Sequence, residues 1–181
     1  IVGPGQQTTF RFQALKEGAF VYHCAVAPIV MHVSSGMYGA IIVLPKGGLS
    51  PVDKEFYLME GDFYTEPSAD DPKRHVYSQE RVTNENPSYV VTNGRVGAVT
   101  GDGALKVKVG DTVRFYYGQA NDESWLHIIG GHFDKVYVTG SFHPDSGREY
   151  GVETTAVSAG SVTVVEYTFK YPGLYLMVNH K

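Results

Sequence analysis

The chain has 181 residues, of which 43% are hydrophobic, and its formal net charge is −4. Its 15 lysine and arginine residues are scattered and outnumbered by 19 acidic residues, so the clustered basic surface of a nucleic-acid-binding protein is lacking. No apolar run reaches the roughly 20 residues that span a bilayer. One cysteine excludes an internal disulfide framework.

Short runs of β-branched and aromatic residues predict an all-β protein of one or two compact domains. Turn signals such as Gly47-Gly48, Asn93-Gly94 and Gly130-Gly131 separate them, and no amphipathic helix longer than a couple of turns is predicted. The predicted strands include 8–12, 19–24, 40–44, 56–60, 112–117 and 135–139.

The second predicted strand leads into a short loop that carries Cys24, His32 and Met37. The spacing Cys-x7-His-x4-Met is the ligand order of a cupredoxin electron-transfer copper. A thiolate, an imidazole and a thioether suit a metal that cycles between Cu(I) and Cu(II). A lone cysteine is usually a buried small hydrophobe and a methionine a core filler, but the joint spacing favours a copper site.

Residues 19–24 alternate like a strand, so neighbouring side chains point to opposite faces. Phe20, Tyr22 and Cys24 share one face, which we expect to point into a core. Val21 and His23 share the other face. Cys24 and His23 can therefore serve two different sites, one inside the sandwich and one at its surface.

An internal repeat connects the two ends of the chain. At a constant offset of 155 residues, a series of glycine, threonine and aromatic positions recurs. The matched positions are Gly5, Thr8, Phe12, Gly18 and Phe20 in the first copy, and Gly160, Thr163, Tyr167, Gly173 and Tyr175 in the second. We infer two copies of one β-sandwich module. The same offset aligns Cys24 with Asn179 and Ala25 with His180.

The repeat predicts the domain boundaries. Residues 1–46 form the C-terminal half of a first domain, residues 47–87 an inter-domain connection, and residues 88–181 a second domain that lacks its last strand. In the second copy a long β-rich segment precedes Gly160, whereas the first copy has no such segment before Gly5. We therefore expect the chain to be the middle of a longer protein.

Over its whole length the chain resembles the copper-containing, nitric-oxide-forming nitrite reductases. Four segments carry the resemblance: 22–25 with His32 and Met37, 91–97, 126–130 and 178–180. The short Cys24–His32 loop is most similar to the neisserial branch of this family, and Met31 stands where the better-studied branch has tryptophan. The resemblance implies tandem cupredoxin-like Greek-key β-sandwiches.

The family's two copper sites map onto this chain residue by residue. Cys24, His32 and Met37, with a histidine from a missing upstream segment, are the implied type 1 ligands. His23, another upstream histidine and His180 from the neighbouring subunit of a homotrimer are the implied type 2 ligands. His127 matches the family's proton-supplying histidine, and Ile129 matches an apolar residue of the nitrite pocket. The family's catalytic aspartate is not in this chain.

The implied reaction is the one-electron reduction of nitrite to nitric oxide and water. The resemblance also implies a small electron-donor protein, either a cupredoxin or a c-type cytochrome, and a periplasmic or outer-membrane-anchored location. Because ligands of both sites are missing, we expect the fragment alone to be inactive.

Two alternatives use part of the same pattern. A two-domain multicopper oxidase needs the sequence His-Cys-His, so that the two histidines flanking the cysteine can bind further coppers. Here Ala25 stands at the second histidine position. A cupredoxin-type electron carrier would use Cys24, His32 and Met37 alone, and it leaves His23, His127 and His180 without a role.

Overall fold

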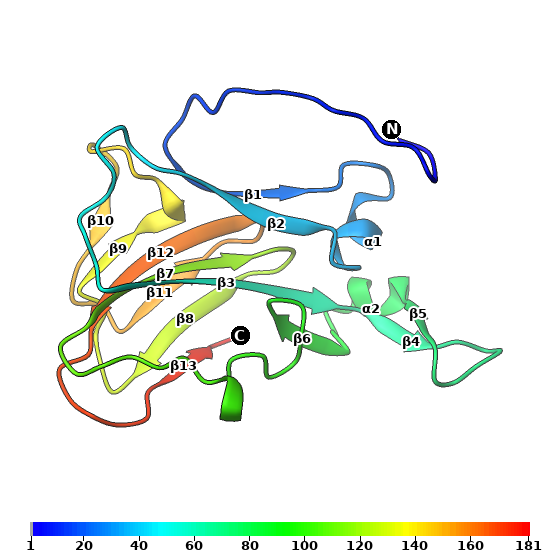
Figure 1. The fold of residues 1–181 in the computed structure, drawn as a ribbon. Helices are drawn as coiled ribbons and strands as arrows, with labels where there is room; N and C mark the ends of the chain where they lie inside the picture. The colour runs from blue at the N-terminus through cyan, green and yellow to red at the C-terminus, as the bar shows by residue number, and fades with distance from the viewer. Residues whose placement is uncertain (1) are drawn as a thin grey trace.

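The computed structural model describes residues 2–181. Within these residues the chain is almost entirely β, so the all-β prediction is confirmed (Figure 1). The helices are α1 (Ile29–Val33) and α2 (Gln79–Thr83), and two 3-10 turns are η1 (Gly101–Gly103) and η2 (Val138–Gly140). Among the described helices, none is long and apolar enough to cross a membrane.

The largest sheet has eight strands, in the order β10-β9-β12-β7-β3-β6, with β1 paired to β12 and β2. All of its neighbouring strands are antiparallel except β3 and β7. The strands are β1 (Gly18–His23), β2 (Tyr38–Val43), β3 (Lys54–Phe63), β6 (Tyr89–Thr92), β7 (Thr112–Gln119), β9 (Lys135–Tyr137), β10 (Arg148–Glu149) and β12 (Ser161–Thr168).

A three-stranded sheet has the order β11-β8-β13, and β4 and β5 form a separate pair. Their bounds are β4 (Thr65–Pro67), β5 (His75–Tyr77), β8 (Ser124–Ile129), β11 (Thr154–Val157) and β13 (Leu176–Asn179). In Figure 1, β1 and β2 lie above the central strands β12, β7 and β3, and β8 and β13 lie below them.

The central strands β7 and β12 are buried along nearly their whole length. One face of these strands packs on the small sheet, where Phe115 and Val165 meet Leu126 and Ile128. The other face packs on β1 and β2, where Val164 belongs to a cluster with Ala19. Strands that are covered on both faces need not alternate between apolar and polar residues, which explains the consecutive buried apolar residues Phe115–Tyr117 in β7 and Val164–Val165 in β12.

The prediction for the buried face of β1 is wrong for this chain. Ala19 and Val21, on the same side as His23, pack against the clusters around β12 and β3. Phe20 and Tyr22, which we expected to be buried, are 43% and 55% exposed. Alternation determines which residues share a face, but burial depends on which face another layer covers, and within residues 2–181 the Phe20 face remains largely uncovered.

The predicted strand at 8–12 is also wrong. These residues are irregular and exposed, because no described strand lies beside them to complete a ladder of backbone hydrogen bonds. Their counterpart in the repeat is the central strand β12. The glycines nevertheless support the duplication: φ is 152° at Gly18 and 156° at Gly173, and both values lie in a region that favours glycine.

The segment 47–87, predicted as a connection between domains, includes β3. This ten-residue strand lies between β7 and β6 in the large sheet, so part of the segment is sheet. The remainder carries the β4–β5 pair and α2. The division of the chain into domains stays a prediction.

Candidate metal centres

The loop after β1 brings Cys24 and His32 together. The backbone N–H of Cys24 donates to the carbonyl oxygen of Met37 at 3.0 Å, which closes the loop between β1 and β2. Short helix α1 lies within this loop and carries His32. As a result, Cys24 Sγ lies 3.1 Å from His32 Nδ1. Met37 directly precedes β2 and is exposed.

The separation of Cys24 and His32 fits a shared metal ion. Tetrahedral ligands at about 2.3 Å for sulfur and about 2.0 Å for nitrogen lie about 3.5 Å apart. The observed 3.1 Å is a few tenths of an ångström shorter, so a small opening of the pair would admit the ion. A thiolate, an imidazole and a thioether, which Cys24, His32 and Met37 of this loop provide, are the donor types that suit copper.

His23 lies on the other side of β1 and is exposed. Its Nδ1 is 2.8 Å from the carbonyl oxygen of Cys24. A carbonyl oxygen only accepts hydrogen bonds, so Nδ1 carries the proton and Nε2 is the nitrogen free to bind a metal. His23 is the last residue of β1 and Cys24 follows it directly; His23 is exposed and Cys24 is half-buried. That the two side chains serve two different sites stays a prediction.

A second group of predicted residues comes together on the small sheet. His127 in β8 is paired with Thr154 of β11 and Val178 of β13. The N–H of His180 donates to the carbonyl oxygen of Trp125 at 3.2 Å and continues the β8–β13 ladder. The rings of His127 and His180 are therefore neighbours, with centroids 5.0 Å apart and planes at 61°.

His127 and Ile129 share one face of β8. Ile129 is partly exposed, and the adjacent inward residues Leu126 and Ile128 are fully buried. His127 Nδ1 lies 2.8 Å from the hydroxyl oxygen of Thr154. The small sheet therefore offers two imidazoles and an apolar side chain on its outer surface, with one imidazole held by a hydroxyl group.

The two groups remain separate. Among residues 2–181, no three histidine, cysteine, aspartate or glutamate side chains are arranged to hold a metal ion. His23 therefore does not complete a cluster with His127 and His180 inside the described chain.

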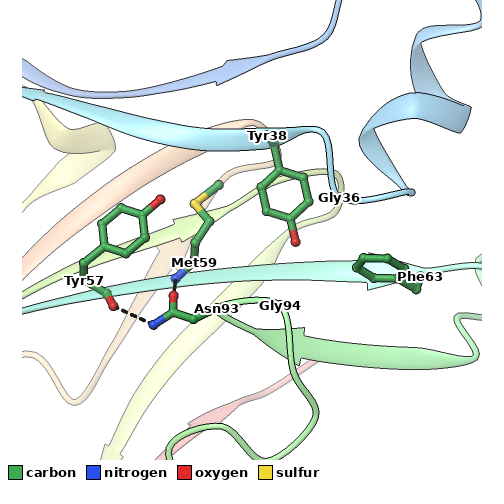
Figure 2. A pocket seen from close by; sticks show the side chains of 7 residues that line it. All are labelled: Gly36, Tyr38, Tyr57, Met59, Phe63, Asn93 and Gly94. Atoms are coloured by element: carbon green, nitrogen blue, oxygen red, sulfur yellow. Dashed lines mark hydrogen bonds between the residues drawn. The ribbon is translucent and has the colours of Figure 1, made fainter. Parts of the chain in front are cut away.

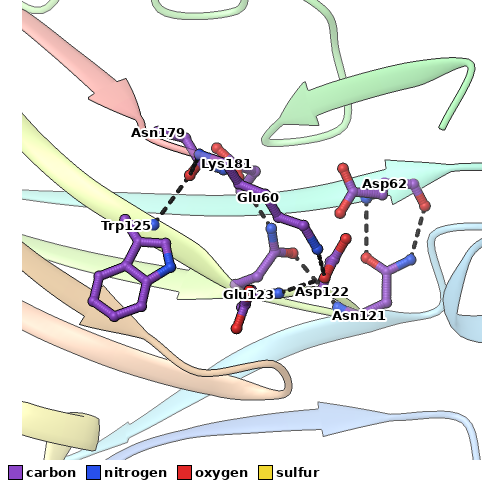
Figure 3. A network of polar contacts seen from close by, with 9 residues as sticks. Glu60, Asp62, Asn121, Asp122, Glu123, Trp125, Asn179 and Lys181 are labelled. Atoms are coloured by element: carbon purple, nitrogen blue, oxygen red, sulfur yellow. Dashed lines mark hydrogen bonds and ion pairs between the residues drawn. The ribbon is translucent and has the colours of Figure 1, made fainter. Parts of the chain in front are cut away.

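A polar network lies beneath the end of β13 (Figure 3). Glu60 of β3 is only 6% exposed, and it accepts hydrogen bonds from Tyr117, Gln119 and Asn179. Burial raises the pKa of Glu60, while the hydrogen bonds from Tyr117 and Asn179 act in the opposite direction. Close by, burial and the charge of Asp122 raise the pKa of Asp62 to about 6.

A pocket lies between β2, β3 and the Asn93–Gly94 turn (Figure 2). Its volume is about 430 Å³, and its walls include Tyr38, Tyr57, Met59 and Phe63. Asn93 is held by both of its amide atoms to the β3 backbone at Met59 and Tyr57. The lining residues include no metal-ligating histidine, cysteine or carboxylate, so the pocket is distinct from the candidate copper ligands.

Sequence reasoning missed Thr154, Glu60 and Asn179 as parts of the site. The pairing of Thr154 with His127 follows from the register of β11 on β8, which one sequence does not reveal. The burial of Glu60 could have been predicted, because it follows Phe56 and Leu58 at alternate positions of a predicted strand. A carboxylate at a position expected to be buried indicates a buried polar network.

Comparisons with known proteins agree with the resemblance drawn from the motifs. The family model described as multicopper oxidase matches residues 1–47. The chain is 47% identical, over 98% of its length, to a copper-containing nitrite reductase of Neisseria meningitidis serogroup B, and covers 45% of that protein. It is 43% identical to a copper-containing nitrite reductase of Neorhizobium galegae, over 99% of this chain and 51% of the relative.

Solved structures agree on the fold. The copper nitrite reductase of Nitrosomonas europaea superposes with a TM-score of 0.80 at 30% identity, over 99% of this chain and 62% of that one. A copper-containing nitrite reductase of Thermus scotoductus gives a TM-score of 0.82 at 27% identity, over 99% of this chain and 41% of that one. The chain spans about half the length of the curated relatives it matches.

Proposed function

This chain is a homologue of the copper-containing nitrite reductases, and we propose that the full-length protein that contains it reduces nitrite to nitric oxide. The reaction consumes one electron and two protons for each nitrite and releases one water molecule. The observation that carries the proposal is the pair of adjacent residues His23 and Cys24. Cys24 Sγ lies 3.1 Å from His32 Nδ1, and the hydrogen bond between His23 Nδ1 and the Cys24 carbonyl oxygen leaves His23 Nε2 free for a second metal ion.

Cys24, His32 and Met37 would hold the type 1 copper together with an upstream histidine. The closed loop between β1 and β2 supports this assignment, since Cys24 is hydrogen-bonded to Met37 through the backbone. A preformed loop brings Cys24 Sγ and His32 Nδ1 close together before the metal binds, which leaves these two donors little rearrangement for a change of oxidation state. The backbone between Cys24 and His23 is then the shortest path between the two sites.

His23 and an upstream histidine would bind the type 2 copper, with His180 donated by the neighbouring subunit of a homotrimer. The exposure of His23 and His180 supports a site made between chains, since each residue is available to a partner surface. When bound, the two coppers supply a one-electron redox couple and an open coordination position for nitrite. Ile129, partly exposed beside His127, would form an apolar wall against the substrate.

His127 would hold and deliver a proton. Imidazole titrates near neutral pH and is suited to proton transfer there. The Thr154 hydroxyl at 2.8 Å fixes the orientation of the His127 ring, and the His180 ring lies edge-on to it. The two imidazoles would lie together on the surface where nitrite binds.

The multicopper oxidase alternative is not favoured. The chain is similar in structure to a solved multicopper oxidase, with a TM-score of 0.78 at 27% identity. However, the relatives at 41–47% identity are named copper-containing nitrite reductases, and Ala25 removes the second imidazole that a three-copper cluster would need. A simple electron carrier leaves the His127, Thr154 and His180 group without a function.

The electron donor, a cupredoxin or a c-type cytochrome, remains a proposal, as does a location in the periplasm or on the outer membrane. The exposed face around Met37 is the surface on which a donor would approach the type 1 ligands.

The proposed function is tested by nitric oxide release. The full-length, copper-loaded protein is reduced without oxygen, nitrite is added, and nitric oxide is followed with an electrode. We expect prompt nitric oxide from the unaltered protein and a loss of at least two orders of magnitude in His180→Ala. Water formation from oxygen in place of nitric oxide from nitrite would identify an oxidase and overturn the proposal.

A further inference from the structure

The residue before His180 is anchored on the opposite sheet. Asn179 is the last residue of β13, and its Nδ2 donates to Oε1 of Glu60 in β3 at 3.0 Å. Its Oδ1 accepts from the backbone N–H of Trp125 and from that of Lys181, each at 3.0 Å (Figure 3). One amide side chain therefore connects the small sheet, the large sheet and the backbone on the far side of His180.

Glu60 is a rigid anchor for this amide. It is buried, and its other hydrogen bonds come from the Tyr117 hydroxyl at 2.5 Å and from Gln119 Nε2 at 3.0 Å. Tyr117 and Gln119 belong to β7, the central neighbour of β3. A buried carboxylate that accepts three hydrogen bonds has little freedom to move. Glu60 therefore fixes the Asn179 side chain relative to the central strands of the large sheet.

The segment on both sides of His180 is held in the same way. The N–H of His180 donates to Trp125, and the side chain of Lys181 forms an ion pair with Asp122. His180 is thus an exposed imidazole on a fixed backbone. The repeat adds an independent observation, since Asn179 occupies the position that Cys24 occupies in the first copy. In the first copy the side chain at this position lies 3.1 Å from His32 Nδ1, a predicted metal ligand, whereas in the second copy it is hydrogen-bonded to Glu60.

We propose that Asn179 and Glu60 act as positioning residues for His180. The Asn179–Glu60 hydrogen bond replaces, in the second copy of the repeat, the metal link of the first, and it preorganises His180 as a ligand for a copper ion bound between subunits. This proposal rests on the proposed function, because it assigns His180 to the type 2 copper. A fixed backbone raises the metal affinity of a ligand that comes from another chain, because little conformational entropy is lost when the metal binds.

The test uses Asn179→Ala in the full-length, copper-loaded protein. The matched control is Asn121→Ala. Asn121 is also an amide held at both atoms, with its Oδ1 accepting from the Asp62 N–H and its Nδ2 donating to the Asp62 carbonyl oxygen, but none of its hydrogen bonds reaches residues 179–181. Electron paramagnetic resonance reports type 2 copper directly, and hydrogen exchange reports the backbone N–H of His180 without any metal.

We expect Asn179→Ala to lower the affinity for type 2 copper by about tenfold or more. The exchange of the His180 N–H should become faster, while the visible absorption of type 1 copper stays unchanged. Asn121→Ala should change neither property of His180. Glu60→Gln tests the anchor conservatively, because its amide oxygen still accepts from Asn179 and its amide group can donate to Tyr117. We expect this variant to keep type 2 copper, whereas Glu60→Leu should behave like Asn179→Ala.

Two failures are distinguishable. If the unaltered full-length protein binds no type 2 copper and makes no nitric oxide, the proposed function fails. If it does both, and Asn179→Ala keeps its type 2 signal, its copper affinity and its slow His180 exchange, the positioning role of Asn179 is refuted. Equal loss of type 2 copper in Asn121→Ala would also refute it, because that result would show a general destabilisation of the sheet.

Discussion

Asp62 offers a quantitative test of the buried acidic network beside β13. Its side chain is 4% exposed, and within the described residues its backbone is bound by Asn121 while no hydrogen bond to its carboxylate is found. Burial, together with the charges of Asp122 and Glu60, raises the pKa of Asp62 from 3.8 to about 6. The folded protein therefore holds this proton more tightly than the unfolded chain does.

The effect on stability follows from proton linkage. Below about pH 4 Asp62 is protonated in both the folded and the unfolded chain, so it does not lower the free energy of unfolding. Between about pH 4 and pH 6 the unfolded chain loses the proton first, so the free energy of unfolding falls as pH rises. At pH 7 the cost reaches at most roughly 3 kcal/mol, from 1.36 kcal/mol for each tenfold change in proton affinity. Asp62→Asn removes the charge, so it should stabilise the chain at pH 7 and have little effect at pH 4.

The assay is urea unfolding of this chain at pH 4, 5.5 and 7, with the free energy extrapolated to water. The control is Asp102→Asn, which removes an exposed carboxylate in η1. We expect Asp62→Asn to gain about 1–3 kcal/mol over the unaltered chain at pH 7, and the control to gain none. A gain that is equal at pH 4 and pH 7 would refute the reasoning, since it could not come from the ionisation of Asp62.

Three further predictions concern the site and its support. Cys24→Ala should abolish the strong visible absorption of thiolate-bound copper in the full-length protein, and survival of the colour would show that Cys24 is not the ligand. His127→Ala should keep both coppers yet slow turnover and flatten its pH dependence, as measured by nitric oxide release. An unchanged rate would remove His127 from proton transfer. Leu126→Ala, at a side chain that is 1% exposed, should lower the free energy of unfolding by about 2–5 kcal/mol in urea titrations. A loss below about 1 kcal/mol would show that the core under His127 is not packed as described.

What the sequence predicts well is local. Cys24, His32 and Met37 lie within one short loop, so their spacing alone predicts their proximity, and the Sγ–Nδ1 distance agrees with it. The assignment of His23 to the face opposite Cys24 also follows from the period of a strand, and it stays a prediction. Five of the six strands named from the sequence are present, as β1, β2, β3, β7 and β9, because β-branched and aromatic runs mark them whatever their neighbours are.

The parts that failed depend on distant partners. Alternation placed Phe20 with Tyr22, but only the packing of β1 on β12 shows that Ala19 and Val21 are on the covered side. The hydrogen bond from Asn179 joins residues 119 positions apart in the chain. Such contacts are set by strand order and register, and one sequence contains no local signal for them beyond the charged Glu60 in an apolar strand.

The most direct test of the account is the paramagnetic resonance spectrum of the full-length, copper-loaded protein with His180→Ala. We expect the type 2 signal to disappear, while the type 1 signal and its visible absorption persist through Cys24 and His32. Loss of both signals would mean that His180 supports the fold and is not a ligand. Retention of both would place the second copper elsewhere and contradict the assignment of His23 and His180 to a shared site.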